Sequence, residues 1–153
     1  MLVFHKDLVV LDFEAPDAKT VIDALASRMH AFSLVSAEYG QDTYERELEH
    51  PTGLPTQPFC IAFPHADAHG VKKSALAVAI LRQPVVFKNM ADPDENLEVY
   101  LVIMLANNSP EEQIQTLRNL ALLFGQPEKL QALRGQSTPE ETVAWLRLEL
   151  GLS

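Results

Sequence analysis

The chain has 153 residues, of which 47% are hydrophobic and 22% charged, so we expect one domain, residues 1–153, with a sizeable core. Twelve basic against 21 acidic residues leave a net charge of −9, which argues against the basic face that nucleic-acid-binding proteins need. The single cysteine, Cys60, excludes an internal disulfide. No signal peptide is recognisable, and no apolar run reaches the roughly 20 residues of a membrane helix. We therefore expect a cytoplasmic protein.

The first third of the chain predicts a strand and two helices. Residues 8–13 (LVVLDF) have the composition of a short strand. Residues 15–32 carry apolar side chains at helical spacing, with Asp17 as a plausible N-cap. A second short helix over residues 41–50 is expected to end before Pro51.

The middle of the chain predicts three strands, at residues 60–63, 76–81 and 99–106. The second and third are apolar throughout, which is typical of strands that are buried on both faces of a sheet.

The last third predicts three helices. The first, residues 109–124, opens with Ser109 as N-cap, Pro110 at the first helical position and Glu112 three residues after the cap. Its predicted apolar stripe consists of Ile114, Leu117, Leu120, Ala121 and Phe124. Residues 126–135, ending with Gly135, predict a second helix. Residues 138–151 predict a third, which opens in the same way, with Thr138 at the cap and Pro139 at the first helical position. Helices before, between and after buried strands indicate an α/β sandwich with the sheet covered on both faces.

The stretch FPHADAH raises the question of chemistry. His65, Asp67 and His69 are residue types that bind zinc or non-haem metals, so a metal-dependent hydrolase is one hypothesis. No other cluster in the sequence has the spacing of metal ligands, and the chain has no glycine-rich phosphate loop and no nucleophile elbow. Cys60 lies within an apolar run, which favours a buried and inert thiol.

A nucleophilic histidine is a second hypothesis. Neutral imidazole, with a reference pKa of roughly 6.5, can accept a phosphoryl group. Pro64 cannot continue a central strand, so His65 is expected where the chain leaves the sheet. From these residues alone, a loop histidine without a role remains the other alternative.

The stretch from Tyr44 to Leu81 resembles the signature of the fructose/mannitol-type IIA domain of the bacterial sugar phosphotransferase system. The matching motifs are the Arg46-Glu47 pair, the turn Pro51-Thr52-Gly53, the strand end Ile61-Ala62-Phe63-Pro64-His65 and the apolar strand that follows. The downstream strand and helix match in order, so the resemblance covers nearly the whole chain. It implies the mannitol/fructose IIA fold, a mixed sheet between two helical layers.

The resemblance also implies a function. His65 would be the phosphoryl acceptor, as a tele-phosphohistidine, receiving the group from the phosphocarrier HPr and passing it to a cysteine of a IIB component, in a system with a membrane IIC. Arg46 would hold the phosphoryl oxygens, since a guanidinium can bind them in bidentate fashion. The transfer needs no metal and no cofactor on this domain, and the resemblance implies neither nucleic-acid binding nor direct membrane insertion.

One position departs from the family pattern. Where mannitol and fructose members usually carry a second histidine, this chain reads Glu112-Gln113-Ile114. Gln113 could donate a hydrogen bond but cannot carry a second charge, and it could equally be an ordinary first-turn residue. The substitution resembles the galactitol-type IIA branch, which implies hexitol uptake. A regulatory module of the nitrogen-related IIA branch, whose phosphorylation state controls protein partners, is the alternative.

Overall fold

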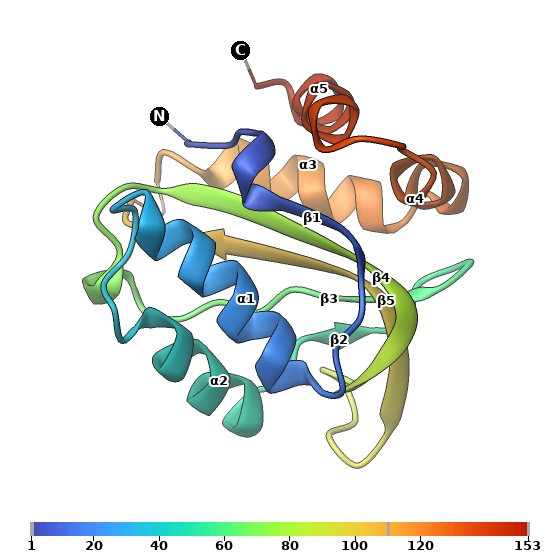
Figure 1. Ribbon diagram of the computed structural model, residues 1–153. Coiled ribbons are helices and arrows are strands. Elements are labelled where there is room, and N and C mark those ends of the chain that lie inside the picture. The colour runs from blue at the N-terminus through green and yellow to red at the C-terminus, as the bar shows by residue number, and fades with distance from the viewer. Residues whose placement is uncertain (1, 110, 153) are drawn as a thin grey trace.

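A mixed sheet lies between two layers of helices in the computed structural model, which describes residues 2–109 and 111–152 (Figure 1). The elements in chain order are η1 (Lys6–Leu8), β1 (Val9–Phe13), α1 (Ala18–Ala31), α2 (Tyr39–Glu49), β2 (Gly53–Leu54), β3 (Cys60–Ala62), η2 (Ala68–Gly70), β4 (Ala75–Lys88), β5 (Asn96–Ala106), α3 (Ile114–Phe124), α4 (Pro127–Arg134) and α5 (Pro139–Leu150).

The five strands are ordered β1-β4-β5-β3-β2. β1 pairs with β4 and β3 pairs with β5 in parallel, whereas the β4–β5 and β2–β3 pairs are antiparallel. Helices α1 and α2 cover one face of the sheet, and α3, α4 and α5 cover the other (Figure 1). The predicted α/β class is therefore confirmed, with both faces covered.

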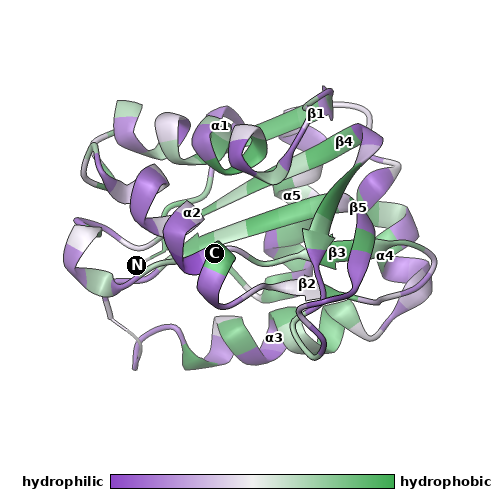
Figure 2. Ribbon diagram, turned by 90° about the horizontal axis from the view of Figure 1, so that it is seen from below, coloured by the Kyte–Doolittle hydropathy of each residue, from purple (hydrophilic) through white to green (hydrophobic). Residues whose placement is uncertain are grey.

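The two central strands form the core, as their apolar sequences predicted. Every residue from Ala75 to Leu81 and from Leu101 to Ala106 is buried. In Figure 2 these strands are largely hydrophobic, whereas the helices around them carry both hydrophobic and hydrophilic residues. Both strands are longer than predicted. Past Arg82, burial alternates along β4, with Val85 and Phe87 inside and Val86 and Lys88 outside, which is the pattern of a half-buried strand.

Two predicted helix caps are confirmed. The Asp17 carboxylate accepts hydrogen bonds from the Thr20 backbone N–H (2.9 Å) and hydroxyl (2.7 Å) at the start of α1. The Thr138 hydroxyl accepts from the Glu141 N–H at the start of α5. Helix α2 begins at Tyr39, two residues before the prediction, and ends at Glu49 as expected before Pro51.

The predicted start of the third-from-last helix is wrong. Helix α3 begins at Ile114 with Gln113 at its N-cap position, not with Ser109. The Ser109 carbonyl accepts from the Glu112 N–H at 3.0 Å, which closes a separate turn before the helix. Pro110, predicted at the first helical position, lies outside the described residues.

The predicted apolar stripe of α3 is also largely wrong. The buried side of the helix holds Thr116, Leu120 and Leu123, whereas Ile114 (46% exposed) and Leu117 (36% exposed) face outward. The sequence carries apolar residues on two faces, and only contact with α4 and α5 selects the face that is buried. Across the described ranges, no helix is long and apolar enough to span a membrane.

Candidate functional site

His65 lies just beyond the end of β3, where Phe63 and Pro64 carry the chain out of the sheet. Its ring is half-buried and packs against the ring of Phe63, with the centroids 5.8 Å apart. The ring nitrogen Nδ1 is 3.0 Å from the Phe63 carbonyl oxygen. Because a carbonyl can only accept, this hydrogen bond requires the proton on Nδ1 and leaves the lone pair of the neutral ring on Nε2.

Helix α2 anchors the loop that carries His65. The Tyr39 hydroxyl, fully buried, accepts a hydrogen bond from the Ala66 backbone N–H at 3.3 Å. Burial raises the pKa of this tyrosine, so the phenol is neutral at ordinary pH. From one turn before the end of the same helix, the Arg46 guanidinium lies 3.7 Å from the Asp67 carboxylate. The helix therefore contacts the chain on the C-terminal side of His65 at two points.

Arg46 combines an exposed head with a buried stem. Its side chain is 39% exposed, while its Nε atom is buried and has no hydrogen-bond partner among the described residues. Arg46 and Asp67 line a cavity of about 280 Å³ together with Asp42, Glu45, Glu49, His50, Ala66 and His69. The arginine is a cation with unused hydrogen-bonding capacity beside the His65 loop, in otherwise acidic surroundings.

Glu47, the neighbour of Arg46, points the opposite way, into the protein. It is 7% exposed, and its carboxylate accepts from the Thr52 N–H and from the Thr52 hydroxyl, both at 2.8 Å. Burial raises the pKa of Glu47 to about 7, against the opposing effect of these two hydrogen bonds. The Thr52 oxygen in turn accepts from the Phe63 N–H at 3.1 Å. The sequence motif indicated the Arg46-Glu47 pair but not this chain of contacts.

The structure explains why the Pro51-Thr52-Gly53 turn ends in glycine. It is buried, and a side chain at this position would place its first carbon 2.4 Å from the Lys88 carbonyl oxygen. The Gly53 carbonyl also accepts from the Met90 N–H across the same contact. Only glycine permits this approach, which fixes where the preceding Thr52 lies.

Gln113 lines a different cavity from Arg46. It is 3% exposed, and the residues that line its cavity with it, none of which lines the cavity beside Arg46, are Leu2, Glu112, Thr116, Arg147, Gly151 and Leu152. The helix that follows does reach the site at its other end, because the Phe124 ring packs edge-on against Phe63 at 5.9 Å.

The three-ligand metal hypothesis is not supported by the geometry. Asp67 faces Arg46, and His69 lies 3.9 Å from Asp42, while His65 uses Nδ1 for the Phe63 carbonyl. In residues 2–109 and 111–152, no three histidine, cysteine, aspartate or glutamate side chains are grouped so as to hold a metal ion. The HxDxH spacing arises in a loop whose alternate side chains turn toward different partners.

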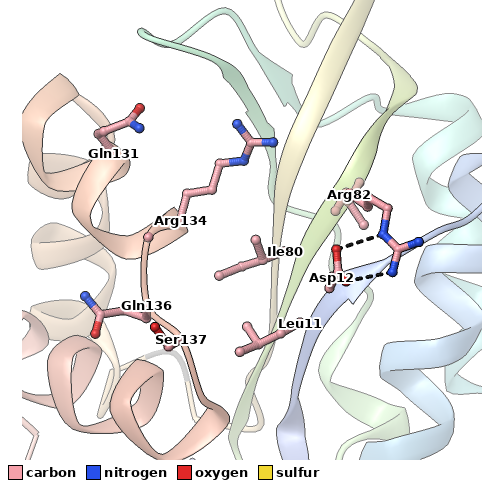
Figure 3. A pocket seen from close by; sticks show the side chains of 10 residues that line it. Leu11, Asp12, Ile80, Arg82, Gln131, Arg134, Gln136 and Ser137 are labelled. Carbon is pink, nitrogen blue, oxygen red and sulfur yellow. Dashed lines mark hydrogen bonds and ion pairs between the residues drawn. The ribbon is translucent and has the colours of Figure 1, made fainter.

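A further cavity, of about 420 Å³, lies between β1, β4 and the segment from α4 to Ser137 (Figure 3). Arg82 lies at one side of it, bound to Asp12 through two hydrogen bonds of 2.8 and 2.6 Å and to Glu14 at 3.0 Å. Arg134, on the opposite wall, stacks over the Tyr100 ring at 4.2 Å. Both cations are already engaged by protein groups, and none of the lining residues belongs to the His65 loop.

Comparison with known proteins gives consistent matches over the whole fold. Residues 2–148 match the family model "Phosphoenolpyruvate-dependent sugar phosphotransferase system, EIIA 2". The galactitol-specific EIIA component of Escherichia coli K12 is 32% identical over 117 residues, covering 76% of this chain and 77% of that protein. The nitrogen regulatory protein IIA-Ntr from Neisseria meningitidis is 27% identical, with a TM-score of 0.70 and 95% of each chain covered.

The fold matches the IIA component in a solved complex of enzyme IIA-mannitol with phosphorylated enzyme IIB-mannitol from Escherichia coli. The TM-score is 0.76 at 21% identity, covering 95% of this chain and 98% of that one. The family model spans all five strands of the sheet as well as the His65 loop and α2. The chain therefore belongs to the EIIA type 2 family of the phosphoenolpyruvate-dependent sugar phosphotransferase system and is a phosphotransferase component of that system.

Proposed function

We propose that this protein is the IIA component of a hexitol uptake system, taking a phosphoryl group from phospho-HPr onto His65 and passing it to a cysteine of a IIB component. Residues 1–153 act as one EIIA domain in the cytoplasm, beside a membrane IIC component. Galactitol is the favoured sugar because the galactitol-specific relative is 32% identical over 76% of this chain.

The hydrogen bond from His65 Nδ1 to the Phe63 carbonyl carries the proposal. It leaves the lone pair on Nε2, which can attack the phosphorus of phospho-HPr. The bond from phosphorus to HPr breaks, HPr leaves with the bonding electrons, and a tele-phosphohistidine forms. In the second step the IIB thiolate attacks the same phosphorus, and Nε2 regains its lone pair.

Arg46 is suited to stabilise the phosphoryl oxygens. In the unphosphorylated protein its head rests near Asp67, and its Nε–H has no acceptor among residues 2–109 and 111–152. A dianionic phosphoryl group on His65 would offer the oxygens that these donors lack. Gln113 stands in the place of the family's second histidine, and we assign it a supporting part at the start of α3.

The outward face of α3 suits a protein partner. Ile114, Leu117, Ala121 and Phe124 form one row along the helix, and the last of them packs on Phe63 next to the His65 ring. Ile114 and Leu117 are exposed apolar side chains in this row. An apolar surface leading to the reactive histidine is what successive docking of HPr and IIB requires.

A regulatory role is the second candidate, because the nitrogen regulatory protein from Neisseria meningitidis is 27% identical over 95% of both chains. In that case His65 would still accept the phosphoryl group, but its state would control binding to other proteins. Onward transfer to a IIB cysteine distinguishes the two roles.

The test is phosphorylation with purified components. The protein is mixed with phosphoenolpyruvate, enzyme I and HPr, and its intact mass is measured at alkaline pH. We expect the gain of one phosphoryl group that is lost in acid, followed by its transfer to the galactitol IIB component when that is added. Phosphorylation of the protein without onward transfer to any hexitol IIB component would favour the regulatory role. No phosphorylation by phospho-HPr would contradict both proposed roles.

Replacing Arg46 is expected to slow phosphoryl uptake by roughly 100-fold in Arg46→Met, the size of effect seen when a transition-state donor is removed. The thermal midpoint should change little, because the guanidinium is half-exposed and pairs only loosely with Asp67. Arg46→Lys keeps the positive charge but lacks the two-pronged guanidinium, so its transfer rate should lie between those of the unaltered protein and Arg46→Met. Stopped-flow measurement of phosphoryl transfer from phospho-HPr gives these rates.

Gln113→Ala is measured in the same way. A transfer rate for this variant within about twofold of that of the unaltered protein would mean that Gln113 takes no part in the site.

A further inference from the structure

The polar backbone groups of Phe63 are both held by side chains rather than by the sheet. The β2–β3 ladder stops at the pair Gly53 and Ala62, so the Phe63 N–H lies just past the last strand partner. The Thr52 hydroxyl oxygen accepts a hydrogen bond from that N–H at 3.1 Å. The Phe63 carbonyl accepts one from His65 Nδ1 at 3.0 Å. The orientation of the imidazole thus depends on where Phe63 is held.

Thr52 can hold Phe63 only because it is itself fixed. Its oxygen accepts from Phe63, so its proton is free to go to the Glu47 carboxylate, and its own backbone N–H goes to the second carboxylate oxygen. Thr52 is 3% exposed and Glu47 7%, so water does not compete for these bonds. The result is a continuous path from helix α2 through Thr52 and Phe63 to the His65 ring.

Pro64 tightens the last link of this path. As a proline it has no N–H, so the Phe63–Pro64 peptide offers only its carbonyl oxygen for hydrogen bonding, and this oxygen is the acceptor of the bond from His65 Nδ1. A displaced Phe63 would therefore displace the acceptor of Nδ1. The ring could then exchange its tautomer and turn Nε2 away from an incoming donor.

We propose that Glu47 and Thr52 are positioning residues for phosphoryl transfer, which hold the Phe63 carbonyl so that His65 keeps its proton on Nδ1 and presents Nε2. This inference rests on the proposed function of His65. Neither residue touches the phosphoryl group, so they act through Phe63 alone. The alternative is that the buried pair only fastens the end of α2 to the turn at residues 51–53.

The deciding variants alter the Thr52 hydroxyl. Thr52→Val keeps the shape and the backbone N–H that donates to Glu47, but it leaves the Phe63 N–H without its acceptor and one oxygen of the Glu47 carboxylate without its hydroxyl donor. Thr52→Ser keeps the hydroxyl. Thr142→Val is the matched control, since Thr142 is also fully buried and also bonds through its hydroxyl, to the Thr138 carbonyl at 2.9 Å in α5. It removes a buried hydroxyl without touching the path to His65.

Two readouts separate positioning from general stability. Nitrogen-15 shifts of the His65 ring at alkaline pH, where imidazole is neutral, report the tautomer without any phosphoryl donor. Rapid mixing with phospho-HPr reports the transfer rate. We expect Thr52→Val to lose the preference for the Nδ1–H tautomer and to react about tenfold more slowly, with Thr52→Ser and Thr142→Val close to the unaltered protein.

An unchanged tautomer and rate in folded Thr52→Val would overturn the positioning proposal while leaving His65 as the acceptor. Should that variant not fold, Thr52→Ala gives the same decision, because the vacated space admits water to satisfy the Phe63 N–H; values equal to those of the unaltered protein again overturn the proposal. If His65→Ala still takes up the phosphoryl group, the proposed function fails, and the positioning role falls with it.

Discussion

Replacing His65 by alanine is expected to abolish phosphoryl uptake from phospho-HPr completely. Nδ1 of His65 is held by the Phe63 carbonyl, so the lone pair of the neutral ring lies on Nε2, the atom that would attack phosphorus. Loss of the nucleophile removes the covalent step itself rather than lowering its rate by a factor. Intact-mass measurement at alkaline pH should show no phosphorylated species in His65→Ala.

His69→Ala is the matched control for this experiment. His69 lies four residues along the same loop, its side chain is 75% exposed, and its nearest charged neighbour is Asp42 at 3.9 Å. We expect this variant to be phosphorylated at the rate of the unaltered protein. Phosphorylation of His65→Ala, or its loss in His69→Ala alone, would assign the acceptor to a different residue.

The second large effect concerns stability against pH. The pKa of Glu47 is raised by burial from 4.5 to about 7. A raised carboxyl pKa means that the folded protein binds the proton more tightly than the unfolded chain does. The stability it contributes is thus fully present below pH 4.5 and is lost as the pH rises through about 7. The shift corresponds to about 3 kcal/mol in the free energy of unfolding.

Glu47→Gln should remove this dependence. A glutamine amide can accept from the Thr52 N–H and donate to the Thr52 hydroxyl oxygen, so it imitates the protonated acid. Denaturant unfolding across the pH range should show the variant gaining about 3 kcal/mol relative to the unaltered protein between acid and mildly alkaline solution.

Glu49→Gln, the same change at an exposed position of α2, is the control and should follow the unaltered protein throughout. The other charged residues that line the same cavity as Glu47, namely Asp17, Lys19 and Lys88, are unchanged in both variants. Parallel pH profiles for the unaltered protein and Glu47→Gln would contradict the assignment of a raised pKa to Glu47.

Much of the fold was predictable because local patterns and tertiary structure agree. The all-apolar runs at Ala75–Leu81 and Leu101–Ala106 can be buried only in the centre of a covered sheet. The caps at Asp17 and Thr138 are local hydrogen bonds that need no distant partner. Helix α3 was predicted less well, because apolar residues on two faces give no unique buried side, and Thr116 and Gln113 are buried where the pattern favoured Ile114 and Leu117.

The residues of the site divide in the same way. The sequence alone determined that a histidine would stand where Pro64 ends a strand, and motif resemblance added Arg46, since both are properties of short contiguous stretches. Only the tertiary structure decided that Nδ1 of His65 is bound by Phe63, that Asp67 and His69 face other partners, and that Gln113 lies in a separate cavity. The tertiary structure also decided that Glu47 is linked to Phe63 through Thr52. Those contacts join α2, the turn at residues 51–53 and the end of β3. No local sequence pattern encodes which of several polar side chains will meet when they are this far apart in the chain.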